Sequence, residues 1–262
     1  MDICAISETA HALADAARGA ILPHFRVGGL VAENKDATGF DPVTVADRAA
    51  EAVMRDILAV RRPNDAILGE EYGAKSGGSG LKWVLDPIDG TRAFVSGAPT
   101  WGVLIAVSDD TGPIYGLIDQ PYIGERFEGG FGRAQLNGPQ GMRPLAVCGN
   151  RPLSQATLMT TFPEVGTAEE GAAFAEVAKA VQLTRYGMDC YAYALLAAGQ
   201  IDLVIEAGLN AYDIQAPIAV IEAAGGIVTD WQGGPAHEGG RALAAAGREQ
   251  HAAALAILRE FA

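Results

Sequence analysis

The segment at residues 86–91, with the sequence Asp-Pro-Ile-Asp-Gly-Thr, constrains this chain more than any other part of it. It directly follows the apolar run at residues 83–85, which predicts a short buried strand. Pro87 has a fixed φ and no backbone N–H, so we expect it to end the strand and to leave the Ile88 carbonyl free. Two carboxylates and a carbonyl on a rigid turn are hard oxygen ligands of the kind that Mg²⁺ prefers.

The end of the same segment suits a phosphate group. Gly90 and Thr91 offer backbone N–H groups at what we expect to be a helix start, where phosphates commonly bind. A metal site beside a phosphate site is the arrangement found in enzymes of phosphoryl transfer. Asp86 and Asp89 also carry like charges close together, which is unfavourable unless a cation neutralises them. The segment therefore predicts a small phosphorylated substrate.

Composition limits the other possibilities. The chain has 262 residues, enough for one large domain or two closely packed halves. It has 19 Lys and Arg against 32 Asp and Glu, a net charge of −13, and no basic run, so we expect no nucleic-acid partner. Cys4, Cys148 and Cys190 are far apart, which favours reduced thiols and a cytoplasmic protein. No apolar run is long enough for a bilayer, so we expect no membrane partner.

Hydrophobic spacing predicts two halves of different organisation. Residues 3–21 and 44–60 have apolar side chains at helical spacing, and the runs that follow predict a largely antiparallel sheet. Farther along, strands and helices alternate, so we divide the chain into an N-terminal half at 1–145 and a C-terminal α/β half at 146–262. We expect a site in the cleft between them. The other expected elements are strands at 66–68, 101–107, 114–118, 125–128, 157–161, 183–184, 203–206 and 227–230, and helices at 168–181, 191–198, 214–224 and 248–261.

Two segments are expected to be surface loops. Residues 28–41 are polar and contain glycine, and their Lys35 and Asp36 either belong to a closing loop or are ordinary solvated charges. Residues 73–80 are rich in glycine and serine, which predicts a flexible loop without chemistry of its own.

Three further acids lie at the ends of expected elements. Glu70 follows a short strand, and if that strand neighbours the one before Asp86, the two carboxylates meet at one sheet edge. Asp213 begins one helix, and Asp47 lies in the first turn of another. Each has a plain structural alternative, because Glu70 could lie in a solvated turn and Asp213 could cap its helix. Asp47 could form a capping box with Thr44.

With these motifs the chain resembles the inositol-monophosphatase-like family of Mg²⁺-dependent phosphatases. The resemblance is carried, in the expected order, by Gly69-Glu70-Glu71, by residues 83–91, and by Tyr212-Asp213 with Gly225-Gly226. It covers almost the whole chain and implies a layered αβαβα sandwich of the inositol monophosphatase and fructose-1,6-bisphosphatase type. It also implies two or three Mg²⁺ ions, in-line attack of a metal-activated water on the phosphate and, commonly, a homodimer.

The resemblance assigns roles to the acids and their neighbours. The metal ligands that it implies are Glu70, Asp86, Asp89, Asp213 and the carbonyl of Ile88. The groups that it places on the phosphate are Asp89, Gly90 and Thr91. Those that it implies for orienting or deprotonating the water are Glu70, and Thr91 supported by Asp47.

Other segments resemble the histidinol-phosphate phosphatase branch, which acts late in histidine biosynthesis, more than the inositol enzymes. They are Thr91-Arg92-Ala93-Phe94, Ile118-Asp119-Gln120-Pro121, residues 185–193 and Tyr212-Asp213-Ile214-Gln215. Histidinol phosphate carries an ammonium and an imidazole, so anions opposite the phosphate should help to bind it. Asp189 and Glu206 could provide these anions, and the substrate contacts that the resemblance implies are Arg92, Asp189, Glu206 and Asp213.

Alternatives remain for this substrate side of the site. Asp189 could instead cap the helix that follows it, and Glu206 could be a solvated acid. Tyr191 and Tyr193 are expected to be packing residues. The nearest rival function is hydrolysis of inositol phosphate or of a sugar or nucleotide bisphosphate. A rival of another class is a metal-binding regulatory protein without catalysis.

Overall fold

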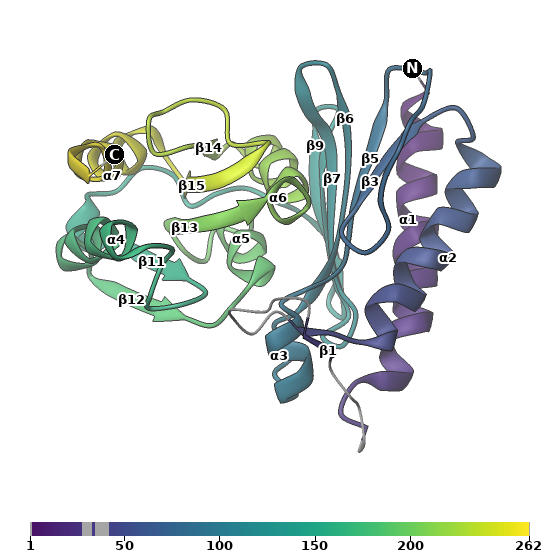
Figure 1. Cartoon of the computed structure of the whole chain (residues 1–262). Helices are drawn as coiled ribbons and strands as arrows, with labels where there is room; N and C mark the ends of the chain where they lie inside the picture. Colours follow the sequence, from purple (N-terminus) through teal and green to yellow (C-terminus); the bar gives the residue numbers. More distant parts are fainter. Residues whose placement is uncertain (1, 28–32, 35–41, 262) are drawn as a thin grey trace.

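The computed structural model describes residues 2–27, 33–34 and 42–261, and it has five layers (Figure 1). Helices α1 and α2 cover one face of a large sheet, and α5 and α6 fill the space between that sheet and a smaller one. Helices α4 and α7 cover the outer face of the smaller sheet, which confirms the αβαβα sandwich. The α-helices of the described part are α1 (Ile3–Ile21), α2 (Val45–Arg61), α3 (Thr91–Ser96), α4 (Ala168–Ala180), α5 (Cys190–Ala197), α6 (Ala211–Ala223) and α7 (Arg248–Leu258).

The large sheet has the strand order β10-β9-β8-β7-β6-β5-β3-β4, and only the pair β3 and β5 is parallel. The smaller sheet has the order β12-β11-β13-β15-β14, with β11 parallel to both of its neighbours. The strands are β1 (Glu33–Asn34), β2 (Pro42–Val43), β3 (Ala66–Gly69), β4 (Gly73–Lys75), β5 (Lys82–Asp89), β6 (Gly102–Asp109), β7 (Gly112–Gln120), β8 (Glu125–Gly130), β9 (Arg133–Gly138), β10 (Gly141–Pro144), β11 (Thr157–Thr160), β12 (Leu183–Tyr186), β13 (Leu203–Asn210), β14 (Ile227–Thr229) and β15 (Gly239–Ala245). Strands β1 and β2 pair with each other.

The central strands are buried on both faces because alternate side chains enter different cores. In β6, Val103 and Ile105 pack with α1 and α2, whereas Leu104 and Ala106 pack with α5 and α6. In β13 the same alternation separates the core under α4 and α7 from the core shared with the large sheet. The α5–α6 layer is therefore apolar toward both sheets and joins them. No described helix is long and apolar enough to cross a membrane.

Several elements differ from the expectations. The prediction that Pro87 ends its strand is wrong, because β5 continues to Asp89 and the missing N–H falls at an irregular step in the pairing with β6. The glycine-rich segment at 73–80 begins with the short strand β4 rather than with a loop. Strands β9, β10 and β15 lie outside the expected elements, since polar, exposed or alanine-rich strands give little alternation. Lys35 and Asp36 lie outside the described residues, and the division at residue 145 stays a prediction.

Helix α6 packs very close to the large sheet because two strand glycines leave room for its backbone. A Cβ on Gly116 in β7 would lie 2.3 Å from the carbonyl oxygen of Ala216. A Cβ on Gly129 in β8 would lie 2.5 Å from the Cα of Val220. Neither distance is possible for real atoms, so both positions require glycine. Because α6 carries Asp213, this contact also fixes where that side chain lies.

Replacing Gly116 by alanine is expected to destabilise the protein by about 1–3 kcal/mol, because the added methyl group has to displace the α6 backbone. Urea unfolding of the two proteins measures this difference. Gly19→Ala is the matched control, since a Cβ at this exposed position of α1 meets nothing within 4 Å and should improve helix propensity. Equal midpoints for wild type and Gly116→Ala would contradict the close approach.

Candidate active site

Two carboxylates meet at one edge of the large sheet because neighbouring parallel strands end together. Gly69 of β3 pairs with Leu85 of β5, so Glu70 and Asp86 are the next residues along the two strands. The Glu70 N–H donates to the Leu85 carbonyl at 3.2 Å, which extends the ladder to this point. Both side chains line the same cleft. The strand arrangement expected for this pair is confirmed.

The irregular step in β5 places Asp89 on the same side as Asp86. The pairing with β6 shifts register between these two residues, and the Asp86 Oδ1 accepts the Ile88 N–H at 3.0 Å inside the step. The Ile88 carbonyl, which was expected to be free, accepts the Thr91 hydroxyl at 3.0 Å. A carbonyl oxygen has two lone pairs, so this contact leaves one for a further ligand.

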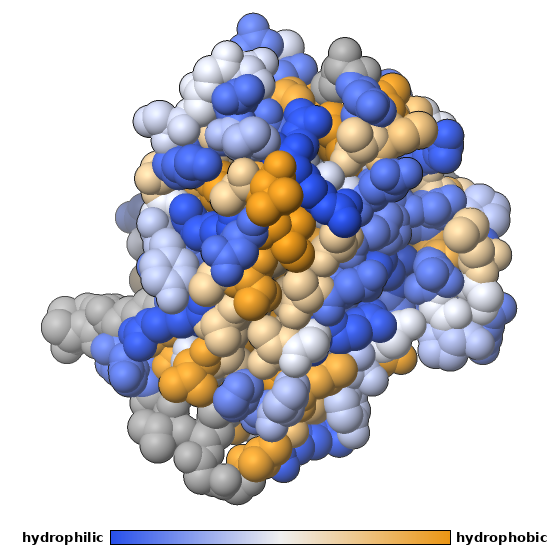
Figure 2. Space-filling view, turned by 90° about the vertical axis from the view of Figure 1, so that its right-hand side faces the viewer, coloured by the Kyte–Doolittle hydropathy of each residue, from blue (hydrophilic) through white to orange (hydrophobic). Residues whose placement is uncertain are grey.

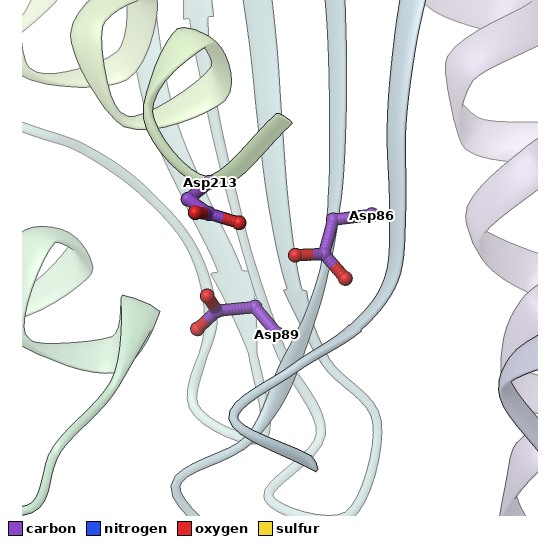
Figure 3. Close-up of side chains that lie close together, drawn as sticks. All are labelled: Asp86, Asp89 and Asp213. Carbon is purple, nitrogen blue, oxygen red and sulfur yellow. The ribbon is translucent and has the colours of Figure 1, made fainter. Parts of the chain in front are cut away.

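Helix α6 contributes the third carboxylate of a cluster. Asp213 is the third residue of α6, and its Oδ2 accepts the Asn210 N–H at 2.6 Å, so it does cap the helix. It also faces the strand residues, because oxygens of Asp86, Asp89 and Asp213 lie within 4.8 Å of one another. Figure 3 shows the three side chains around a common space between β5 and the start of α6. Capping and clustering are therefore compatible.

Burial and crowding make these carboxylates unfavourable as anions. Burial raises the pKa of Asp86 well above its ordinary value, and the neighbouring charges of Glu70 and Asp89 raise it further. Burial likewise raises the pKa of Asp89, to which Asp189 and Asp213 add. A bound dication would reverse both effects, because it stabilises the ionised form. Clustered hard oxygen donors fit Mg²⁺.

The Thr91 hydroxyl connects this cluster to α2. It lies 3.4 Å from Oδ1 of Asp47, and the other oxygen of Asp47 accepts the Thr44 N–H at 2.8 Å and the Thr44 hydroxyl at 2.6 Å. Asp47 thus forms the capping box of α2 and contacts Thr91 as well. Gly90 precedes the first residue of α3 with a φ of 81°, a conformation that glycine adopts without strain.

Asp189 points into the cleft rather than capping its helix. It occupies the N-cap position of α5, but its side chain caps no backbone N–H, and its Oδ2 accepts the Thr100 hydroxyl at 2.9 Å. Its φ of 48° is strained for a residue other than glycine, and such strain is typical of functional sites. Gly90 lies against it, since a Cβ there would be 2.7 Å from the Asp189 Cγ. Burial raises the pKa of Asp189, while the Thr100 hydrogen bond and the Arg92 charge oppose this.

Glu206 is buried, so the alternative that it is a solvated acid is wrong. Its side chain accepts the Thr161 N–H at 3.1 Å and hydroxyl at 2.6 Å on one oxygen, and the Tyr193 hydroxyl at 3.0 Å on the other. Burial raises its pKa to about 7, although these hydrogen bonds favour the anion. Tyr193 therefore does more than pack, because it holds Glu206 and lines the cleft, whereas the Tyr191 hydroxyl donates to Glu125.

These groups share one cleft of about 280 Å³. The expected site residues that line it are Glu70, Asp86, Ile88, Asp89, Gly90, Thr91, Arg92, Asp189, Glu206 and Asp213. The guanidinium carbon of Arg92 lies 4.8 Å from the centroid of the Phe162 ring, which lines the cleft too. Asp47 reaches the cleft through Thr91. The structure thus brings the expected residues together, while their individual roles stay predictions.

Sequence reasoning missed residues that hold these acids in place. Thr100 and Thr161 donate hydroxyls to Asp189 and Glu206, and they gave no signal because Thr100 only precedes one expected strand and Thr161 only ends another. The Cys190 N–H donates to Asp89 Oδ2 at 2.7 Å, a backbone contact that no side-chain motif reveals. Glu51 did leave a signal, since it follows Asp47 by four residues and therefore shares its face of α2.

Comparison with known proteins agrees with this geometry. A family model described as the inositol monophosphatase family matches residues 3–261. The chain belongs to this family. It is 45% identical over 226 residues to a protein of Arabidopsis thaliana named bifunctional phosphatase IMPL2, chloroplastic, a match that covers 85% of this chain and 63% of the plant protein. The chain thus spans less than two thirds of that relative.

Two further matches cover nearly the full length of both proteins compared. The chain is 35% identical over 242 residues to a histidinol-phosphatase of Mycobacterium tuberculosis, with 90% of this chain and 92% of that protein covered. A solved structure of an inositol monophosphatase from Zymomonas mobilis matches with a TM-score of 0.85 and 38% identity, covering 96% of each chain. This family member is therefore a phosphatase of small phosphorylated substrates, while the named substrates of its relatives differ.

Without bound metal, this protein is expected to be less stable at a pH of about 8 than at a pH of about 4. The folded pKa values of Asp86 and Asp89 lie above the ordinary value of 3.8, so the stability that these groups contribute is full below that value and is lost as the pH rises through the folded pKa values. Added Mg²⁺ should restore it at the higher pH. Thermal unfolding in EDTA and in Mg²⁺ at both pH values measures these effects.

The variant Asp89→Asn separates the loss of stability caused by these crowded acids from the effect of other groups that titrate in the same pH range. The asparagine removes one crowded charge and keeps an oxygen for the Cys190 N–H. We expect the melting temperature in EDTA at the higher pH to rise by about 2–4 °C, the change for roughly 1 kcal/mol in a chain of this size. Asp56→Asn, at an exposed position of α2, is the control and should change nothing. A variant that melts below wild type in EDTA would count against crowding.

Proposed function

We propose that this phosphatase hydrolyses histidinol phosphate to histidinol and phosphate in histidine biosynthesis, with two or three Mg²⁺ ions as cofactors. The observation that carries the proposal is that one cleft holds two kinds of acid. The cluster of Asp86, Asp89 and Asp213 fits the metal, and the separate acids Asp189 and Glu206 suit the ammonium and imidazole of the substrate. The name of the Mycobacterium tuberculosis relative supports the same substrate.

The residues of the chain divide into three groups in this proposal. The oxygens that would hold the metal come from Glu70, Asp86, Asp89, Asp213 and the carbonyl of Ile88. When bound, Mg²⁺ supplies positive charge to the phosphate and lowers the pKa of a bound water. Glu70 and Thr91 orient the attacking water, and the one proton of the Thr91 hydroxyl has two nearby acceptors, the Ile88 carbonyl at 3.0 Å and the Asp47 carboxylate at 3.4 Å.

The remaining contacts concern the substrate. Asp89, together with Gly90 and Thr91 at the start of α3, contacts the phosphate. Asp189 and Glu206 bind the cationic end, and their hydrogen bonds from Thr100 and Tyr193 fix the positions of their oxygens. Arg92 adds a cation to the lining, where its charge acts on Asp189.

The metal dependence can be tested directly. We expect EDTA to abolish phosphate release and Mg²⁺ to restore it. Asp86→Asn should lower kcat by more than about 100-fold, because it removes a charge that would hold the metal ion while keeping the side-chain volume. Its melting temperature in EDTA should not fall below that of wild type. Activity that is insensitive to the chelator would contradict the proposed cofactor.

The substrate can be tested by comparing phosphate release from histidinol phosphate and inositol 1-phosphate in Mg²⁺. We expect histidinol phosphate to be preferred. Asp189→Asn should lower kcat/KM for it by roughly 10- to 100-fold, the effect of about 1.5–3 kcal/mol for a hydrogen bond to a charged group, and should affect inositol 1-phosphate less. Asp110→Asn, in an exposed turn, is the charge-matched control.

The comparison also decides between the other functions. The Zymomonas mobilis structure is described as an inositol monophosphatase, so a preference for inositol 1-phosphate would favour that activity over ours. A sugar or nucleotide bisphosphate would be the next substrate to assay if both compounds react slowly. A protein that binds Mg²⁺ but hydrolyses none of these would be a non-catalytic metal-binding regulator. The contact of Thr91 with Asp47 argues against this, since a pure metal binder needs no such pair.

A further inference from the structure

Helix α2 carries two buried carboxylates one turn apart. Asp47 is 1% exposed and Glu51 is completely buried, and a spacing of four residues puts both on the same face of the helix. Asp47 contacts Thr91, as described above. Glu51 accepts hydrogen bonds from the backbone just beyond Glu70.

The Glu51 carboxylate closes the turn between β3 and β4. One oxygen accepts the Glu71 N–H at 2.6 Å, and the other accepts the Tyr72 N–H at 3.2 Å. The Arg55 Nε donates to that second oxygen at 2.7 Å, so the buried charge is paired. Hydrogen bonds to an ionised acceptor are among the strongest in proteins, and here they fix two successive residues of one turn.

Gly69 shows how closely the carboxylate approaches this turn. A Cβ on Gly69 would lie 2.0 Å from the Glu51 Oε1 and 2.4 Å from its carboxyl carbon. Any larger residue would expel the Glu51 side chain, so the glycine is needed for the contact. Glu70 lies between Gly69 and the two residues whose N–H groups Glu51 binds, and its own N–H is fixed by Leu85. Its backbone is thus held on both sides.

We propose that Glu51 is a positioning residue for the metal site. Its carboxylate fixes the turn after β3 so that the Glu70 carboxyl faces Asp86 before any metal arrives. This rests on the proposed function, in which Glu70 is a metal ligand and orients the water. Without Glu51, part of the free energy of metal binding would be spent on ordering the turn. Through Glu51 and Asp47, a single helix supports Glu70 and Thr91 together.

Glu51→Gln tests the proposal because it keeps the volume but turns one acceptor oxygen into an amide that cannot accept an N–H. We expect calorimetric titration with Mg²⁺ to show binding weakened by about 10- to 100-fold, the usual effect of losing a group that orients a ligand. In phosphate-release assays, the Mg²⁺ concentration for half-maximal rate should rise by the same factor. Gly69→Ala should reproduce both changes by pushing the Glu51 carboxylate away, and it keeps the test open if Glu51→Gln does not fold.

Asp65→Asn is the matched control for a purely structural role. Asp65 is a buried acid at the opposite end of β3, where it accepts the Trp83 Nε1–H at 2.9 Å and the Arg62 Nε–H at 2.6 Å. Its loss should lower the melting temperature and leave the Mg²⁺ affinity of the folded protein unchanged. If Glu51→Gln behaves like Asp65→Asn, with lower stability but wild-type Mg²⁺ affinity, the inference is wrong. A wild-type protein that binds no Mg²⁺ would instead overturn the proposed function.

Discussion

Electrostatic repulsion among the acids of one cleft is the constraint on which the rest of this structure depends. Asp86, Asp89 and Asp213 come so close that burial and their mutual charges raise the pKa values of the first two. A chain left to relax would move such groups apart. They stay together because each is attached to an element that large apolar cores hold in place.

The fold meets this constraint through backbone geometry. The parallel pair of β3 and β5 ends two strands at one edge, and the irregular step in β5 adds a second acid from the same strand. Helix α6 brings the third acid from across the cluster, and this helix can approach the sheet only because Gly116 and Gly129 have no side chains. The α5–α6 layer is apolar toward both sheets, so it holds the two sheets and α6 in fixed positions relative to one another.

Two other buried acids named above, Glu206 and Glu51, have different surroundings. Glu206 accepts hydrogen bonds from Thr161 and Tyr193, and burial raises its pKa to about 7. Glu51 is paired with Arg55 and bound to backbone N–H groups, which suits a fixed support. Acids of one chemical type thus differ in their pKa values because burial and hydrogen-bond partners differ.

The sequence by itself determined the chemistry and most of the elements, because the segment at 86–91, the acids at element ends and the apolar spacing are local signals. It could not show that β5 passes through Pro87, that Asp189 turns away from its helix end, or that Glu51 binds the turn beyond Glu70. Only the tertiary structure decided these points, since each depends on contacts between segments far apart in the chain, where packing overrides local preference.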